Sequence, residues 1–342
     1  MSALTSLFAC ESKPEKQKFN AYYFDWFDTA TIITGYEENK EDFDKVMAEV
    51  EKIFDKYHKL YNIYLKYDGI NNLATVNTKN GGVHNPVRVD AEIIELIDFS
   101  REMNRITDGK FNIAMGSVLS IWHYHREVGL DNPSEASLPD MDKLLEASKH
   151  INMSDISVDE KESTVYLADP EMSLDVGAVA KGYACEMAAK RLEEIGAYGY
   201  IINAGGNIRA VGQKPDGSDW AVGIENPDST NEETPYITQL KFKDKALVTS
   251  GSYQRFYTVE GKNYHHIIDP DTLMPSEKYL SVSILCNDSG MGDALSTALF
   301  NMDFEDGKRL VESLSDVEAL WVLPDGKICR STGFHKYETV NG

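Results

Sequence analysis

Apolar and polar residues recur along the chain with two different periods, which predict where helices and strands lie. The strongest helical pattern covers residues 41–62, where seven apolar side chains form one stripe: Phe43, Val46, Val50, Ile53, Phe54, Tyr57 and Leu60. The same period predicts three further helices, the first after Asp90, the second over residues 180–195 and the third over residues 292–302.

Period-two alternation and short apolar runs predict the strands. An aromatic-rich strand is predicted over residues 19–34, and residues 129–140 are predicted to be a loop. Two hairpins are predicted, with turns at residues 260–263 and 324–326. Other strand-like runs are residues 163–168, 198–204, 220–225, 237–242, 246–251 and 280–286. Because strands and helices do not alternate strictly and no linker divides the chain, we expect one α+β domain with mixed or antiparallel sheets and packed helices.

Composition narrows the range of partners. The chain has 342 residues, of which 42% are hydrophobic, and 34 Lys+Arg stand against 56 Asp+Glu, a formal charge of -22. Such a surface repels phosphate backbones, so nucleic-acid binding is not expected. An anionic ligand would need a local source of positive charge, such as a metal ion, a helix N-terminus or a few cationic side chains.

The N-terminus predicts a lipid anchor. The apolar run Leu7-Phe8-Ala9 precedes Cys10, and a polar, charged segment follows to residue 18. This order is typical of a bacterial lipoprotein signal that has lost its basic start, with Cys10 as the lipidated residue. Residues 1–18 would then be signal remnant and tether, and residues 19–342 an extracytoplasmic domain held at the membrane only through the lipid. The alternative is an ordinary frayed terminus.

The remaining cysteines do not indicate a metal site. Cys185, Cys286 and Cys329 lack CxxC spacing, and no histidine cluster accompanies them. Cys185 and Cys286 fall in apolar patterns, so we expect both to be buried free thiols.

Residues 173–196 combine an acid, a base and a small-residue turn at the start of a predicted helix. Asp175 and Lys181 flank the turn Gly177-Ala178-Val179-Ala180. Free amides at a helix start suit a phosphate or a carboxylate, and small residues allow a ligand to approach the backbone. In the alternative interpretation Asp175 is an ordinary helix N-cap and Lys181 is a solvated side chain.

Two further stretches contain candidate ligands. Asp293 and Thr297 are four residues apart on a predicted helix, so their oxygens share one face and could hold a hard cation such as magnesium. The alternative is a Thr bonded back to its own helix and an Asp near the helix N-terminus. His266 could be a general base, an anion contact or a structural histidine. The segment Asn203-Ala-Gly-Gly-Asn207 predicts a tight turn, without the spacing of a dinucleotide fingerprint or P-loop.

Five motifs in this order resemble the FAD:protein FMN transferase (ApbE) family: "DVGAVAKGYA", "NAGGN", "TSGSYQRF", "HHIIDP" and "DALSTALF". The upstream stretches "FDWFDTATIIT", "YDGINNLATVN" and "DGKFNIAMGSVLSIW" are similar to the family's N-terminal half. The resemblance runs from about residue 19 to the end, and a lipoprotein-like start is common in this family. It implies a single T-fold-like α+β domain.

The resemblance also implies an activity. Members use Mg²⁺ to cleave the pyrophosphate of FAD, attach FMN through a phosphoester bond to a Ser or Thr of an exported target flavoprotein, and release AMP. Two alternatives keep the same FAD pocket. One is an FAD pyrophosphatase that releases free FMN and AMP, and the other is a lipoprotein that binds FAD without turnover.

Site roles follow from the matched motifs. The resemblance implies a metal site made of the Ala178 carbonyl, Asp293 and Thr297, and makes His266 or Asp293 the helper that takes the acceptor's proton. It implies FAD contacts at Phe27, Tyr64, Ala114, Met115, Gly116, Asp175, Lys181 and Ile267. The chain departs from the family at Asp271-Thr272-Leu273, where Thr-Gly is common, and at Asn207, where many members have Asp.

Overall fold

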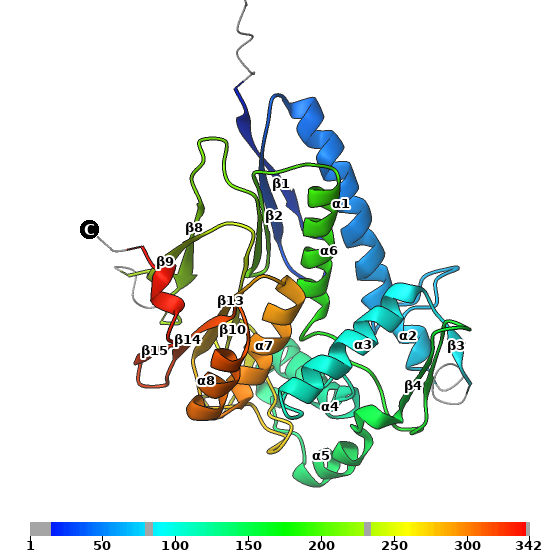
Figure 1. The fold of residues 1–342 in the computed structure, drawn as a ribbon. Coiled ribbons are helices and arrows are strands. Elements are labelled where there is room, and N and C mark those ends of the chain that lie inside the picture. Colours follow the sequence, from blue (N-terminus) through cyan, green and yellow to red (C-terminus); the bar gives the residue numbers. More distant parts are fainter. Residues whose placement is uncertain (1–14, 79–84, 229–233, 340–342) are drawn as a thin grey trace, which may run out of the picture.

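One antiparallel sheet of eight strands forms the centre of the molecule (Figure 1). The computed structural model describes residues 15–78, 85–228 and 234–339, so the predicted lipoprotein signal and Cys10 lie outside the described residues. In spatial order the strands are β1 (Gln17–Tyr23), β2 (Thr31–Glu37), β6 (Tyr200–Ala204), β7 (Asn207–Val211), β10 (Ala246–Gly251), β13 (Ser281–Cys286), β14 (Glu318–Val322) and β15 (Ile328–Arg330). The predicted α+β class is confirmed.

Helices pack on one face of this sheet and a two-stranded ribbon packs on the other. Because successive side chains of a strand point to opposite faces, Val248 joins the helix-side core while Leu247 joins the core under the ribbon. The ribbon is β8 (Trp220–Glu225) with β9 (Tyr236–Phe242). The helices against the sheet are α1 (Lys40–Tyr61), α6 (Ala180–Glu194), α7 (Ser289–Asn301) and α8 (Phe304–Ser313).

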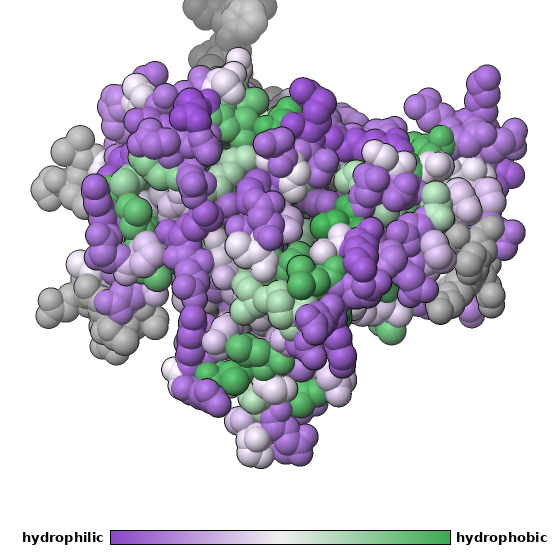
Figure 2. All heavy atoms as spheres, turned by 90° about the horizontal axis from the view of Figure 1, so that it is seen from below, coloured by the Kyte–Doolittle hydropathy of each residue, from purple (hydrophilic) through white to green (hydrophobic). Residues whose placement is uncertain are grey.

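The middle of the chain forms a smaller region at the lower end of the molecule in Figure 1. It contains α2 (Leu73–Val76), α3 (Ala91–Ile106), α4 (Gly116–Asp131), α5 (Met141–Ala147) and a small sheet of β3 (Val87–Arg88), β5 (Thr164–Leu167) and β4 (Ile156–Asp159). The hairpin of β11 (Phe256–Val259) and β12 (Lys262–His265) packs against α4. From below, the apolar groups of this end are broken up by hydrophilic side chains (Figure 2).

The longest predicted helix and both hairpins are confirmed. The first hairpin turns at Glu260-Gly261, where both residues have positive φ, and the second has its positive φ at Gly326. Cys185 and Cys286 are buried free thiols, as predicted. Within the described residues no helix is both long and apolar enough to cross a bilayer.

Two predictions about elements are wrong, and one alternative interpretation is excluded. Residues 19–34 form parts of two strands, β1 and β2, because the chain reverses in a turn that the alternation does not reveal. The predicted loop at 129–140 begins with the last turn of α4 and contains a short 3-10 helix at Pro133–Glu135. Asp175 is not the N-cap of α6, because that helix begins at Ala180 with Val179 at the cap position.

Candidate functional site

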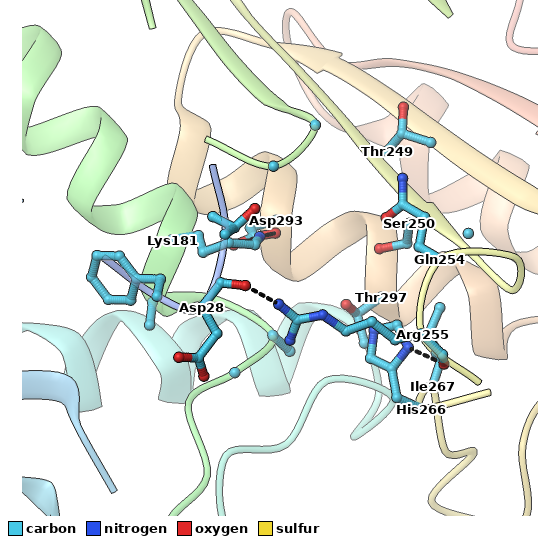
Figure 3. A pocket seen from close by; sticks show the side chains of 18 of the residues that line it. Asp28, Lys181, Thr249, Ser250, Gln254, Arg255, His266, Ile267, Asp293 and Thr297 are labelled. Atoms are coloured by element: carbon cyan, nitrogen blue, oxygen red, sulfur yellow. Dashed lines mark hydrogen bonds and ion pairs between the residues drawn. The ribbon is translucent and has the colours of Figure 1, made fainter. Parts of the chain in front are cut away.

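A cavity of about 1040 Å³ lies where the sheet, the N-terminal end of α6, the inner face of α7 and α4 meet. Ten of the twelve predicted site residues line it: Phe27, Tyr64, Met115, Asp175, Ala178, Lys181, His266, Ile267, Asp293 and Thr297. They come from segments up to 270 residues apart in the sequence. The fold therefore brings together motifs that are widely separated along the chain. Figure 3 shows Lys181, Asp293, Thr297 and His266 around one space.

The close approach of α6 to α7 depends on a glycine. A Cβ at Gly182 would lie 2.3 Å from the Ser289 carbonyl oxygen and 2.6 Å from the Asp293 Cβ, which real side chains do not tolerate. This contact lets the Gly182 N–H donate to Asp293 Oδ2 over 2.9 Å, while Lys181 Nζ lies 3.1 Å from Asp293 Oδ1. The Asp293 carboxylate is therefore held by partners on α6 although it is only 5% exposed.

The same contact leaves the Ala178 carbonyl without its usual helical hydrogen-bond donor. In a regular helix the Gly182 N–H would bond to the Ala178 carbonyl four residues earlier. Here it bonds to Asp293, and none of the hydrogen bonds among the described residues reaches the Ala178 oxygen. The Thr297 hydroxyl likewise has no protein partner within the described ranges, and it lines the cavity from the same face of α7 as Asp293.

These oxygens suit a hard cation. A carboxylate, a hydroxyl and a backbone carbonyl are ligand types that magnesium or calcium prefers. In the part of the chain that the structure describes, no three His, Cys, Asp or Glu side chains are grouped so as to hold a metal. The set formed by Asp293, Thr297 and Ala178 contains only one such side chain, and its donor chemistry fits Mg²⁺ with further ligands supplied by substrate and water.

Asp175 shapes the turn before α6. Its side chain accepts a hydrogen bond from the Gly177 N–H over 2.8 Å, and its own N–H donates to the Ile113 carbonyl. Burial raises the pKa of the Asp175 carboxyl above its usual value. The residue thus positions the Gly177-Ala178 turn and also presents a carboxyl group to the cavity.

His266 lies inside the cavity, directly after β12. Its Nδ1 is 3.2 Å from the Arg255 carbonyl, which can only accept, so Nδ1 carries the proton and Nε2 keeps a free lone pair. The ring faces the open volume but protein surrounds it, and this desolvation lowers the pKa of His266 to about 3. The imidazole is therefore neutral near pH 7 and can accept a hydrogen bond from a substrate hydroxyl.

Two predicted contacts do not line the cavity. Ala114 is fully buried and its N–H is bonded to Asn112 Oδ1 over 2.8 Å. Gly116 lies against Ser173, whose carbonyl oxygen would be 2.5 Å from a Cβ at this position. Both residues lie behind the wall and position Met115, which does line the cavity.

Tyr64 lies at the mouth of the cavity. Its side chain is 62% exposed, and its ring stacks on His123 of α4 with ring centroids 5.3 Å apart. Partial burial raises the pKa of the Tyr64 hydroxyl to about 12. The phenol therefore stays protonated and can offer an aromatic face to a ligand.

Sequence reasoning missed the turn that precedes β2. Phe27 and Asp28 have φ values of 53° and 51°, and left-handed backbone costs a non-glycine residue about 1–2 kcal/mol. The turn is held from two sides. The Phe27 N–H donates to His58 Nδ1 over 3.2 Å, and Arg255 Nη2 donates to the Asp28 carbonyl over 3.0 Å (Figure 3). Neither His58 nor Arg255 was singled out, because no local pattern indicates these pairings.

Comparison with known proteins shows the family. The ApbE family model matches residues 27–321. A protein of Treponema pallidum named FAD:protein FMN transferase is 31% identical over 303 residues, which cover 84% of this chain and 81% of that protein. A protein of the same name from Haemophilus influenzae is 26% identical over 86% of this chain and 83% of its own.

Solved structures agree with this result. The ApbE protein of Thermotoga maritima superimposes with a TM-score of 0.81 at 27% identity, covering 94% of this chain and 100% of that one. The flavin transferase ApbE of Vibrio cholerae superimposes with a TM-score of 0.77 over 94% of this chain and 99% of its own. At 21% identity, this second similarity concerns the fold alone.

Proposed function

The chain belongs to the ApbE family, and we infer that it is a flavin transferase that takes FAD as substrate and attaches FMN to a protein. One observation carries this inference beyond family membership: a cavity of about 1040 Å³ has the oxygens of Asp293, Thr297 and Ala178 on its wall, with Lys181 beside them. This arrangement offers an anionic ligand a positive charge in a chain whose formal charge is -22.

The finer proposal is that the reaction depends on Mg²⁺ and forms a phosphoester with a Ser or Thr of the target. Asp293, Thr297 and the Ala178 carbonyl would hold the ion, which supplies charge neutralisation at the pyrophosphate. The acceptor oxygen forms a bond to the FMN phosphorus, the bond from that phosphorus to the bridging oxygen breaks, and AMP leaves. Lys181 faces the same region and would balance charge on the phosphate oxygens.

The acceptor hydroxyl must lose a proton during attack. His266 Nε2 has a free lone pair, and Asp293 carries a carboxylate next to the proposed metal. Either group could take the proton, and the low pKa of His266 makes it a weak base at equilibrium. We therefore keep both residues as candidates for this role.

We further propose that the protein is lipid-anchored outside the cytoplasm through Cys10. The supporting observation is the order of an apolar run, a small residue, Cys10 and a polar segment, directly before the described domain. Expression of the full chain with Cys10→Ser should move the protein from the membrane fraction to the soluble fraction. Unchanged membrane association of the variant would rule out this anchor.

The test of the activity is a mixing experiment. The protein is incubated with FAD, Mg²⁺ and an acceptor domain that bears an exposed Ser/Thr-Gly-Ala-Thr segment, and intact mass and AMP are measured. A mass gain of one FMN on the acceptor, with AMP, that disappears with Asp293→Ala establishes transfer. AMP with free FMN and an unmodified acceptor would support a pyrophosphatase. Bound FAD without either product would support a binding lipoprotein.

A further inference from the structure

The turn at Phe27-Asp28 connects two walls of the cavity, and we propose that His58 is the positioning residue that holds it ready for FAD. The proposal rests on the proposed function, because it concerns the affinity for that substrate. In this proposal the neutral His58 ring keeps the turn closed, and acid weakens FAD binding by removing the acceptor on which the turn depends.

The turn needs an external support. Thr29 N–H donates to the Trp26 carbonyl over 3.2 Å, and the two central residues both have positive φ, a conformation that usually requires Asn or Gly. Asp28 belongs to a residue type that tolerates this conformation, but Phe27 does not, and both line the cavity. Their conformation must therefore be stabilised by contacts with other elements.

His58 supplies one of these contacts from α1. Its Nδ1 accepts the Phe27 N–H over 3.2 Å, and its ring meets the Phe27 ring edge-on, with centroids 5.5 Å apart. An N–H group can only donate, so Nδ1 must be unprotonated and Nε2 must carry the proton. Tyr67 Oη lies 3.4 Å from Nε2 and can accept a hydrogen bond from the N–H group there. The contacts thus define one neutral tautomer.

The surroundings of His58 act on its charge in both directions. Burial is the largest influence and lowers the pKa of the imidazole below 6.5, and Lys59 lowers it further. Asp28, Asp55 and Asp25 raise it. Because the effect of burial is the largest, the ring is neutral at pH 7 and takes up a proton only at a pH below the ordinary pKa of histidine. A proton on Nδ1 would then face the Phe27 N–H, and the hydrogen bond would be lost.

Arg255 transmits the position of the turn across the cavity. Its Nη2 donates to the Asp28 carbonyl over 3.0 Å, and its own carbonyl accepts from the His266 N–H over 3.2 Å (Figure 3). A displaced turn would release Arg255 and loosen the His266 segment. His58 therefore influences groups on the opposite wall that it does not touch.

The experiment measures the dissociation constant for FAD between about pH 5 and pH 7.5, by flavin fluorescence, for the wild type and three variants. His58→Asn keeps an acceptor oxygen near the place of Nδ1 but does not titrate. His58→Leu has a similar volume and no acceptor. His125→Asn is the matched control, because His125 lies on α4 outside the cavity lining.

We expect the wild-type constant to rise about threefold or more toward pH 5, as the binding-competent fraction falls. His58→Asn should remove this rise and bind within about threefold of wild type at pH 7.5, whereas His58→Leu should bind about tenfold more weakly, which corresponds to roughly one lost hydrogen bond. His125→Asn should follow the wild-type profile. A thermal melt of each variant separates weaker binding from unfolding.

Two results would overturn the proposal: an acid rise that persists in His58→Asn, or wild-type affinity in a folded His58→Leu. If His58→Leu does not fold, the pH dependence of FAD binding by His58→Asn still tests the proposal. Wild-type protein that binds no FAD at pH 7.5 would contradict the proposed function instead, so the two failures are distinguishable.

Discussion

At the scale of single residues, Asp293 and Thr297 of α7 differ in how much they contribute to the stability of the fold. Asp293 accepts hydrogen bonds from Gly182 and Lys181, so its removal affects both folding and ligand binding. The Thr297 hydroxyl has no partner among the described residues. A change at Thr297 therefore tests ligand binding almost separately from stability.

Thr297→Val should lower the rate of FMN transfer by about 10- to 100-fold, because the hydroxyl proposed as a metal ligand is replaced by a methyl group of the same size. The free energy of unfolding should change by less than about 0.5 kcal/mol, since no protein hydrogen bond is lost. Transfer is measured by intact mass and stability by urea unfolding. Thr297→Ser, which keeps the hydroxyl, should retain most of the activity, and full activity of the Val variant would contradict the proposed metal site.

A buried histidine next to the site predicts how stability depends on pH. His265 donates from Nε2 to the Ser276 carbonyl over 2.8 Å and accepts the Ile267 N–H at Nδ1, so it is neutral in the fold. Burial lowers its pKa, and the unfolded chain therefore binds the proton more tightly. Its contribution to stability is present above about pH 6.5, the ordinary histidine value, and is lost as the pH falls below it.

This is checked by urea unfolding of wild type and His265→Asn between about pH 5 and pH 8. The variant keeps an acceptor near Nδ1 but cannot take up a proton, so its free energy of unfolding should fall less steeply toward acid. Equal slopes for the two proteins would show that His265 does not contribute.

At the scale of elements, a buried ion pair behind the site fixes the crossing of α6, α7 and β7. Glu186 and Arg209 are each only 4% exposed, and Arg209 Nε donates to Glu186 Oε2 over 2.8 Å. The same oxygen accepts the Ser289 N–H over 2.9 Å at the start of α7. This carboxylate thereby sets how closely Lys181 approaches Asp293.

Glu186→Ala should lower the free energy of unfolding by about 3–5 kcal/mol, because Arg209 would remain buried without its partner. Glu193 is the matched control, since it lies 3.4 Å from Arg209 with its side chain 40% exposed. Glu193→Ala should cost less than about 1 kcal/mol. Urea unfolding of both variants measures the difference, and equal losses would contradict the structural role given to Glu186.

The elements also show what the sequence could predict. The Asp293 and Thr297 pair was predictable, because a helix places every fourth side chain on one face. The glycine turn at residues 205–206 was predictable for a similar local reason, and both glycines have positive φ. The division of residues 19–34 into two strands was not, because Phe27 is not a turn residue and a lone Asp28 without Gly or Pro is a weak turn signal. The support from His58 and Arg255 depends on pairings 31 and 227 residues apart.

At the scale of the whole molecule, net charge opposes the approach of the substrate. The formal charge of -22 repels an anionic dinucleotide while it is still far from the protein. Lys181, Arg126 and Arg255 line the cavity and attract the ligand only once it is close to them. Salt shortens the range of this repulsion, to about 8 Å at physiological ionic strength.

Raising the salt concentration from about 10 to 150 mM should therefore speed FAD association, by roughly two- to tenfold, as long-range repulsion is screened. Stopped-flow fluorescence measures the rate, and uncharged riboflavin serves as the control ligand whose rate should change little. A slower FAD association at higher salt would mean that the cavity's own cations dominate at long range.

The sheet that carries the site joins distant parts of the chain. β2 pairs with β6 through Thr31 and Ala204, and the cavity wall is completed only by Thr297 and Asn301 on α7. Pairing over such separations makes folding slow compared with helical proteins. A chain still emerging from the ribosome therefore lacks a competent pocket until its last sixth is made, so flavin is captured only by finished molecules and no shorter N-terminal fragment should compete for it.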